Sequence, residues 1–155
     1  MITFSLSLSR ILQSIYAETA LHNVVCGKPT LPPALHRDHR AMLEYGVRDS
    51  FAAMCMRLLP CLVDCSPETD TNSDLLTLTL NDDVAAATSS VQASALRRLM
   101  EHVVIYDTLS RCYLNYDKGV SDDYHQRATD AAETLSTTLR MTAVPPNLSL
   151  TGAWM

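Results

Sequence analysis

Hydrophobic and polar residues alternate in two short segments of the chain. In residues 2 to 8, Ile2, Phe4, Leu6 and Leu8 alternate with threonine and serine, and in residues 75 to 80 leucines alternate with threonines. A period of two is typical of a strand with one buried face. We therefore predict two short strands. A lone strand leaves its backbone groups unpaired, so the two should pair with each other or with a neighbouring subunit.

Four other segments repeat apolar residues every three to four positions, the spacing of a helix with one buried face. We predict helices over residues 9 to about 25, 38 to 63, 81 to 116 and 121 to about 143. Ser9, Ser121 and the run Asn81-Asp82-Asp83 supply the expected N-caps, because their side-chain oxygens can accept from the first backbone N–H groups. Pro60 should kink or loosen the last turn of the second helix.

The segments between these helices are rich in proline, glycine and polar residues. Residues 26 to 35 and 65 to 74 are predicted connectors, and the short turn at residues 117 to 120 makes the last two helices antiparallel neighbours. Only four of the 155 residues are glycine, which disfavours a turn-rich all-β fold. The expected fold is mainly α: an antiparallel bundle of about four helices with two short strands over residues 1–141, and an extended tail over residues 142–155.

Composition and charge narrow the classes of partner. The formal net charge is −5, and no basic stretch is longer than a pair such as Arg97-Arg98, so direct recognition of nucleic acid is not expected. No run of about 20 apolar residues predicts a membrane span. The N-terminus lacks the features of a signal peptide. The five cysteines, an odd number without a CxxC, are interpreted as reduced thiols in the cytosol.

Several groups of polar residues were weighed as metal sites and rejected. His36 and His39 are three apart around Asp38, but no third ligand follows. The spacing of Cys61 and Cys65 fits one zinc pair, yet a second pair is missing. We therefore expect no metal and no cofactor.

Two further sets of residues have some features of a chemical site. Glu18 and His22 are four apart and lack the Glu-x-x-His spacing of di-iron bundles. Glu101 and His102 with Asp107 could form an acid–base group, but neither a nucleophile nor a glycine-rich loop accompanies them. We therefore predict that the chain is not an enzyme.

The layout from Leu75 onward carries a family resemblance. An alternating strand leads through Asn81-Asp82-Asp83 into a long helix bearing aromatics, and a brief turn leads into a helix that starts Asp-Asp-Tyr and contains Ala-Ala-Glu. The N-terminal stretch TFSLSLSRIL adds to this layout. Over residues 2 to 20 and 75 to 141, the chain resembles small neck proteins of tailed phages and prophages of gut Bacteroidetes. It also resembles head-to-tail adaptor proteins, which are small helical bundles arranged in a ring beneath the portal.

The resemblance implies a structural virion protein that is assembled in the host cytoplasm. It would form a ring-like homo-oligomer in the neck and contact portal and tail proteins. Strands and an apolar tail suit such binding, because strand edges add to neighbouring chains. The predicted interface residues are Ile2, Phe4, Leu6, Leu76, Leu78, Leu148, Leu150 and Trp154. The alternative is a small bacterial helical protein-binding module or regulator, which would form a small closed oligomer.

Overall fold

Helices make up most of the described chain, together with one small sheet. The computed structural model describes residues 1–26, 39–66 and 74–143. Its elements are β1 (Ile2–Ser7), α1 (Leu8–Cys26), α2 (Arg40–Leu58), the short 3-10 helix η2 (Leu59–Cys61), β2 (Leu62–Ser66), β3 (Leu75–Leu80), α3 (Asp82–Ala87), α4 (Ser90–Tyr113) and α5 (Lys118–Ala143). The predicted mainly α fold with short strands is confirmed.

The sheet has three antiparallel strands in the order β1-β3-β2. The two predicted strands pair with each other, in a register that sets Phe4 opposite Leu78 and Leu6 opposite Leu76. β2 was not predicted. Its residues had been assigned to the end of the second helix and to the following connector, which is a correction to both assignments. A bulge at Val63 interrupts its pairing with β3.

The second helix ends earlier than predicted because the backbone changes direction around Pro60. The α-helix stops at Leu58, and Pro60 lies in η2, which leads directly into β2. Proline lacks the N–H that would continue the helical ladder. Leu62, which falls within the predicted second helix, is therefore a strand residue opposite Leu80.

Asp74 fixes the junction between β1 and α1. Its carboxylate accepts from the Ser7 hydroxyl at 2.8 Å and from the backbone N–H of Ser9 at 2.9 Å. The Ser9 hydroxyl also donates to this carboxylate, and its hydrogen bond, followed by that of the Ser7 hydroxyl, holds the pKa of Asp74 below its ordinary value because both favour the charged form. The predicted N-cap, Ser9, is wrong: α1 begins at Leu8, and the hydroxyl of Ser7 accepts from the N–H of Arg10.

The predicted long helix over residues 81 to 116 is two helices. Asn81 caps α3 as predicted, accepting from the N–H of Val84 at 3.1 Å. α3 ends at Ala87, and Ser89 then starts α4 with a capping box in which its hydroxyl and the side chain of Gln92 each bond the other's backbone. Such reciprocal bonds satisfy two helix N–H groups at once, so a new helix starts here.

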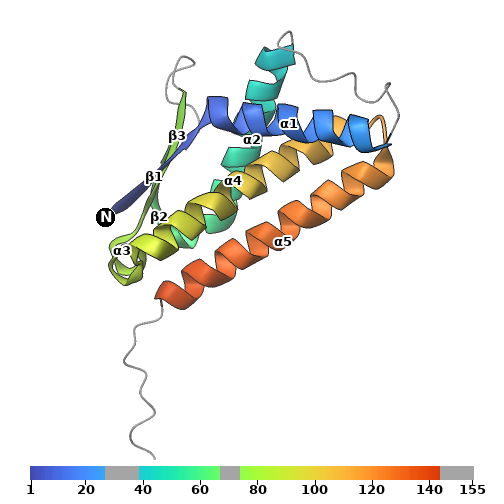
Figure 1. Ribbon diagram of the computed structural model, residues 1–155. Helices are drawn as coiled ribbons and strands as arrows, with labels where there is room; N and C mark the ends of the chain where they lie inside the picture. The colour runs from blue at the N-terminus through green and yellow to red at the C-terminus, as the bar shows by residue number, and fades with distance from the viewer. Residues whose placement is uncertain (27–38, 67–73, 144–155) are drawn as a thin grey trace, which may run out of the picture.

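The core lies between the sheet and the helices. Figure 1 shows the sheet at one end of the molecule, and α5 running alongside α4. α1, α2 and α4 contact the strands, and α4 also packs against α1 and α2. The side chains with less than 2 % exposure include Phe4, Leu6, Ile11, Ile15, Leu43, Phe51, Leu76, Leu78, Leu80, Leu96, Met100 and Tyr113.

Gly46 lies in the middle of α2, where glycine destabilises a helix relative to alanine. A Cβ built at this position would have Thr108 Cγ2 as its nearest neighbour, at 3.6 Å, which is ordinary contact. We therefore expect Gly46→Ala to raise the free energy of unfolding by about 0.5–1 kcal/mol. Urea denaturation followed by circular dichroism measures this change. A decrease instead would show that α2 and α4 cannot accept even one methyl group here.

Candidate functional site

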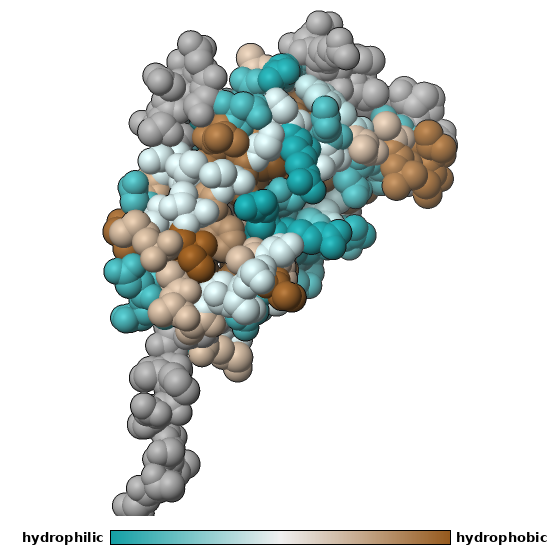
Figure 2. Space-filling view, turned by 60° about the vertical axis from the view of Figure 1, so that its left-hand side comes forward, coloured by the Kyte–Doolittle hydropathy of each residue, from teal (hydrophilic) through white to brown (hydrophobic). Residues whose placement is uncertain are grey.

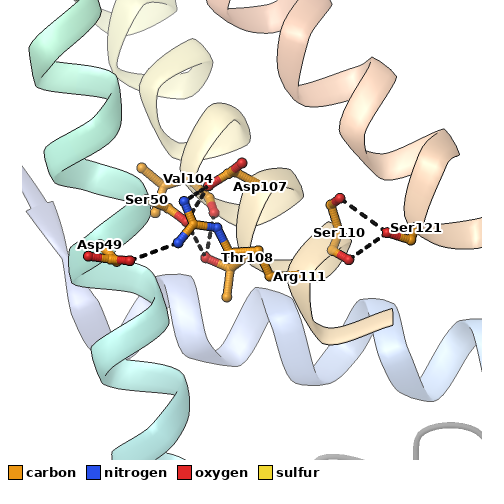
Figure 3. A network of polar contacts seen from close by, with 8 residues as sticks. All are labelled: Asp49, Ser50, Val104, Asp107, Thr108, Ser110, Arg111 and Ser121. Carbon is orange, nitrogen blue, oxygen red and sulfur yellow. Dashed lines mark hydrogen bonds and ion pairs between the residues drawn. The ribbon is translucent and has the colours of Figure 1, made fainter. Parts of the chain in front are cut away.

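A polar network joins α2 to α4 (Figure 3). The hydroxyl of Ser50 donates to Asp107 Oδ2 at 2.6 Å, and Thr108 Oγ1 lies 3.2 Å from Ser50 Oγ. Arg111 forms ion pairs with Asp49 at 2.8 Å and Asp107 at 3.1 Å. Sequence reasoning missed this network, although the four-residue spacing of Asp107 and Arg111 was a usable signal for a helical ion pair.

The network links the two helices, and its two hydroxyl groups are buried. Ser50 and Thr108 are each 1 % exposed, so neither hydroxyl can reach a substrate in solution. The cavity beside Ser50, Asp107 and His125 has a volume of about 30 Å³. That is room for about one water molecule, whereas ligand pockets typically occupy several hundred Å³.

A pair of serines, Ser110 and Ser121, joins α4 to α5 (Figure 3). Ser121, the predicted N-cap of the last helix, instead lies inside α5, where its buried hydroxyl donates to the carbonyl of Ser110 at 2.8 Å. Asp117 caps α5, accepting from the N–H of Val120 at 3.2 Å. The helix begins three residues before Ser121 because Asp117 performs this role.

The structure separates the acid–base residues weighed from the sequence. Asp107 faces α2 in the polar network, whereas His102 lines a groove of about 290 Å³ between α1 and α4. Glu18 lines the same groove and lies 3.4 Å from the hydroxyl of Tyr124. The two candidates Glu18 and His102 therefore share one groove, while Asp107 belongs to another surface.

Three tyrosine rings stack between α4 and α5, and one of them, Tyr106, lines this groove. Tyr124 packs between Tyr106 and Tyr113, with ring centroids 6.0 and 5.8 Å apart. The ring of His102 is tilted against Tyr106, and that of His22 meets Tyr113 edge-on. Burial, with the negative charge of Glu18 as the next cause, raises the pKa of Tyr124 to about 12. This phenol therefore stays protonated at neutral pH and remains a donor to Glu18.

Cys55 and Cys61 are buried, and Cys65 and Cys112 are partly buried. Burial raises the pKa of Cys55 and of Cys112, and a hydrogen bond with Cys65 adds to the effect at Cys55. The four cysteines whose state is described, Cys55, Cys61, Cys65 and Cys112, are free thiols. Among the described residues no group of three or more His, Cys, Asp or Glu is arranged to hold a metal. His36 and Asp38 lie outside the described residues.

The predicted interface residues lie in different environments. Phe4, Leu6, Leu76 and Leu78 are each at most 2 % exposed, so the chain's own helices cover their side chains. Ile2 is half-buried. Leu148, Leu150 and Trp154 lie outside the described residues. Contact of these residues with another subunit stays a prediction.

The outer edge of β1 is open along the described chain. The N–H of Leu8 donates to the carbonyl of Asp74. In an antiparallel pair only every second residue forms hydrogen bonds with the partner strand, so counting back from Leu8 in this register identifies the residues of β1 that bond to β3. The backbone groups of Thr3, Ser5 and Ser7 therefore point away from β3. β1 has no charged residue, proline or bulge, the features that usually protect an edge strand. β2, the other edge, carries both the bulge at Val63 and the charge of Asp64.

An apolar patch covers the end of the molecule where α1 finishes and α4 turns toward α5. Figure 2 shows apolar side chains gathered at this end. The most exposed are Leu21, Val24, Val25, Leu114 and Tyr116, at 53–80 %. Exposed apolar patches often mark contact surfaces. Residues 27–38 follow α1 directly and lie outside the described residues, so we assign no partner to this patch.

Comparisons with known proteins add no relative. No protein-family model matches the chain, and neither a curated protein nor a solved structure matches it. Within the described ranges, none of the helices combines the length and apolar character needed to cross a membrane.

Proposed function

We propose that this chain is a structural virion protein, a phage neck or head-to-tail connector that assembles in a ring between portal and tail. The observation that carries the proposal is the open edge of β1. Its outward N–H and C=O groups form a ready template for a strand from another chain. Portal and tail proteins as partners, and the virion neck as location, rest on the resemblance of layout described above.

Ring formation needs two different surfaces on each subunit, because every subunit contacts one neighbour on each side. The two edge strands of this sheet differ in whether they can accept a further strand. β1 is open, whereas β2 is protected by its bulge at Val63 and by Asp64. If the β1 edge of each subunit accepts a strand that the neighbouring subunit supplies, the contact is head-to-tail. Such contacts can close into a ring.

A non-catalytic role is part of the proposal. The hydroxyls of Ser50 and Thr108 are buried in a link between helices, and the cavity beside them holds about one water molecule. The alternative, a small bacterial protein-binding module or regulator, is favoured by the groove of about 290 Å³ that Glu18 and His102 line. It would use one discrete partner and form a small closed oligomer.

The mass of the purified full-length chain tests the proposal, measured by light scattering and then by particle imaging. We expect rings or large multimers, alone or after mixing with a portal. Ser5→Pro should abolish these multimers, because proline lacks the outward N–H and its ring adds bulk at the edge. The pairing of β1 with β3 should survive, because the N–H of Ser5 points away from β3. Ser5→Ala is the matched control, since it removes only the hydroxyl and should assemble normally.

Circular dichroism of each variant separates failed assembly from failed folding. Ser5→Pro should retain the helical signal of the parent chain. A monomer or dimer that persists at high concentration and in the presence of a portal would overturn the connector proposal and favour the binding module. Rings that form equally well with Ser5→Pro would show that the β1 edge is not the assembling surface.

A further inference from the structure

The C-terminal residues repeat the two-sided pattern of the sheet. Residues 147 to 151 read Asn-Leu-Ser-Leu-Thr, so leucines alternate with hydroxyl residues. β1 and β3 have the same pattern, with Phe4, Leu6, Leu76 and Leu78 on the buried face. A period of two places alternate side chains on opposite faces of a strand. The tail thus has the sequence of a further strand of the same kind.

The opposite face of the sheet carries hydroxyl groups. The side chains of Thr3 and Thr79 meet across β1 and β3 with their hydroxyl oxygens 3.0 Å apart. Ser5 lies opposite Thr77 in the same register. A strand added at the β1 edge with Ser149 and Thr151 on this face would continue the hydroxyl rows. Its Leu148 and Leu150 would then extend the apolar layer beside Phe4 and Leu6.

The end of α5 lies on the side of the molecule from which β1 starts. α5 contacts α3, and the amino group of Met1 forms an ion pair with Asp82 of α3 at 3.3 Å. Figure 1 shows the end of α5 next to α3 and close to the chain's N-terminus. The twelve residues after Ala143 span at most roughly 40 Å when extended. This exceeds the roughly 20 Å length of a six-residue strand, so the tail is long enough to cross to a neighbouring copy.

We propose that residues 147–151 of one copy add as a fourth strand to the open β1 edge of the next copy. This inference rests on the proposed assembly and names its occupant. Pro145-Pro146 favours extended backbone where the chain leaves α5. An extended exit carries the tail onward, whereas a return to its own β1 requires the chain to reverse. Each copy then gives a strand at one surface and accepts one at another, as a ring requires.

Disulfide cross-linking in the full-length chain tests the contact. The variant carrying Ser5→Cys and Ser149→Cys places a thiol on each of the two strands, on the same face. Facing residues on adjacent strands have Cβ atoms about 4.5–5.5 Å apart, within range of a disulfide after small adjustments. Under mild oxidation we expect a ladder of covalent multimers on non-reducing gels, which reduction collapses to monomer. Thr3→Cys and Ser7→Cys, each with Ser149→Cys, cover pairings shifted by two residues.

Two controls define the background. Ser149→Cys alone reports cross-links to the native cysteines. Gln126→Cys with Ser149→Cys places the second thiol at an exposed position on α5, away from β1. Both should give less than a tenth of the multimer ladder. A cross-linked product that stays monomeric would show that the tail pairs with β1 of its own copy. If none of the three β1 positions gives cross-links above the controls, the tail does not bind this edge. Either result overturns the proposal.

Competition by a peptide with the sequence of the tail provides a second measurement. A synthetic peptide of residues 144–155, added in excess to the assembled full-length protein, should compete for the edge and dissociate the multimers. A peptide with the same residues in scrambled order should leave them intact. One outcome separates the two proposals. If Ser5→Pro abolishes assembly, but neither the peptide nor the double variant Leu148→Asp with Leu150→Asp affects it, the β1 edge is the assembling surface and the tail is not the strand that binds it.

Discussion

Replacing Phe51 by alanine should lower the free energy of unfolding by about 3–5 kcal/mol, the usual cost of removing a buried phenylalanine. Phe51 lies on α2 with no exposed surface, in the hydrophobic cluster that joins the helices to the sheet. The loss combines the hydrophobic transfer energy of the ring with the cavity that it leaves. A domain typically has only 5–15 kcal/mol of stability, so the variant should be close to unfolding at ordinary temperature.

Urea denaturation followed by circular dichroism measures this effect. Met56→Ala is the matched control on the same helix, because Met56 is 67 % exposed. Its effect should stay within about 0.5 kcal/mol, as for most surface substitutions. The dependence on urea concentration should be unchanged in both variants, since the surface exposed on unfolding is nearly the same. A loss below 1 kcal/mol for Phe51→Ala would contradict the central position of this ring in the core.

Asp107→Ala should cost about 1–3 kcal/mol, the price of leaving a buried donor without its acceptor. Asp107 accepts the hydrogen bond of Ser50, which is buried between α2 and α4, and it also pairs with Arg111. Removal of this carboxylate disturbs both interactions together. The loss should appear in thermal and urea denaturation, with α2 and α4 separating more readily.

Two related variants divide this effect. Asp107→Asn retains an acceptor for Ser50 and removes the charge, so it should cost about 0.5–1 kcal/mol. Asp49→Ala removes the exposed partner of Arg111 and should cost less than about 1 kcal/mol. If Asp107→Asn is as damaging as Asp107→Ala, the ion pair with Arg111 dominates and the buried hydrogen bond contributes little.

The strands β1 and β3 were predictable because their alternation is strict and one face is fully buried. β2 was not, because Leu58 and Leu62 are four apart and continue the helical stripe of α2. What makes Leu62–Ser66 a strand is tertiary: the backbone groups of Thr77 and Thr79 point away from β1 and need a second partner. The pattern of apolar residues along the chain does not show that these backbone groups of β3 require a second hydrogen-bonding strand.

Helix ends and the packing of the strands' apolar face are hard to predict from the sequence for related reasons. Ser9 and Ser121 are good N-cap residues, but Ser7 and Asp117 are just as good and lie closer to the actual starts. Phe4 and Leu78 were correctly identified as apolar strand residues on one face. Whether that face is covered by helices of the same chain or by a neighbour depends on how the helices pack, and here the helices of the same chain cover it.

The order of strands in the sheet has a consequence for synthesis of the chain on the ribosome. β3 lies between β1 and β2, yet it is the last of the three to be made. No strand of the described sheet can pair with its neighbour until residue 80 has emerged. Phe4 and Leu6 therefore leave the ribosome long before the surface that covers them exists. The first half of the nascent chain exposes an apolar strand throughout this interval, and it is then a substrate for chaperones that bind such segments.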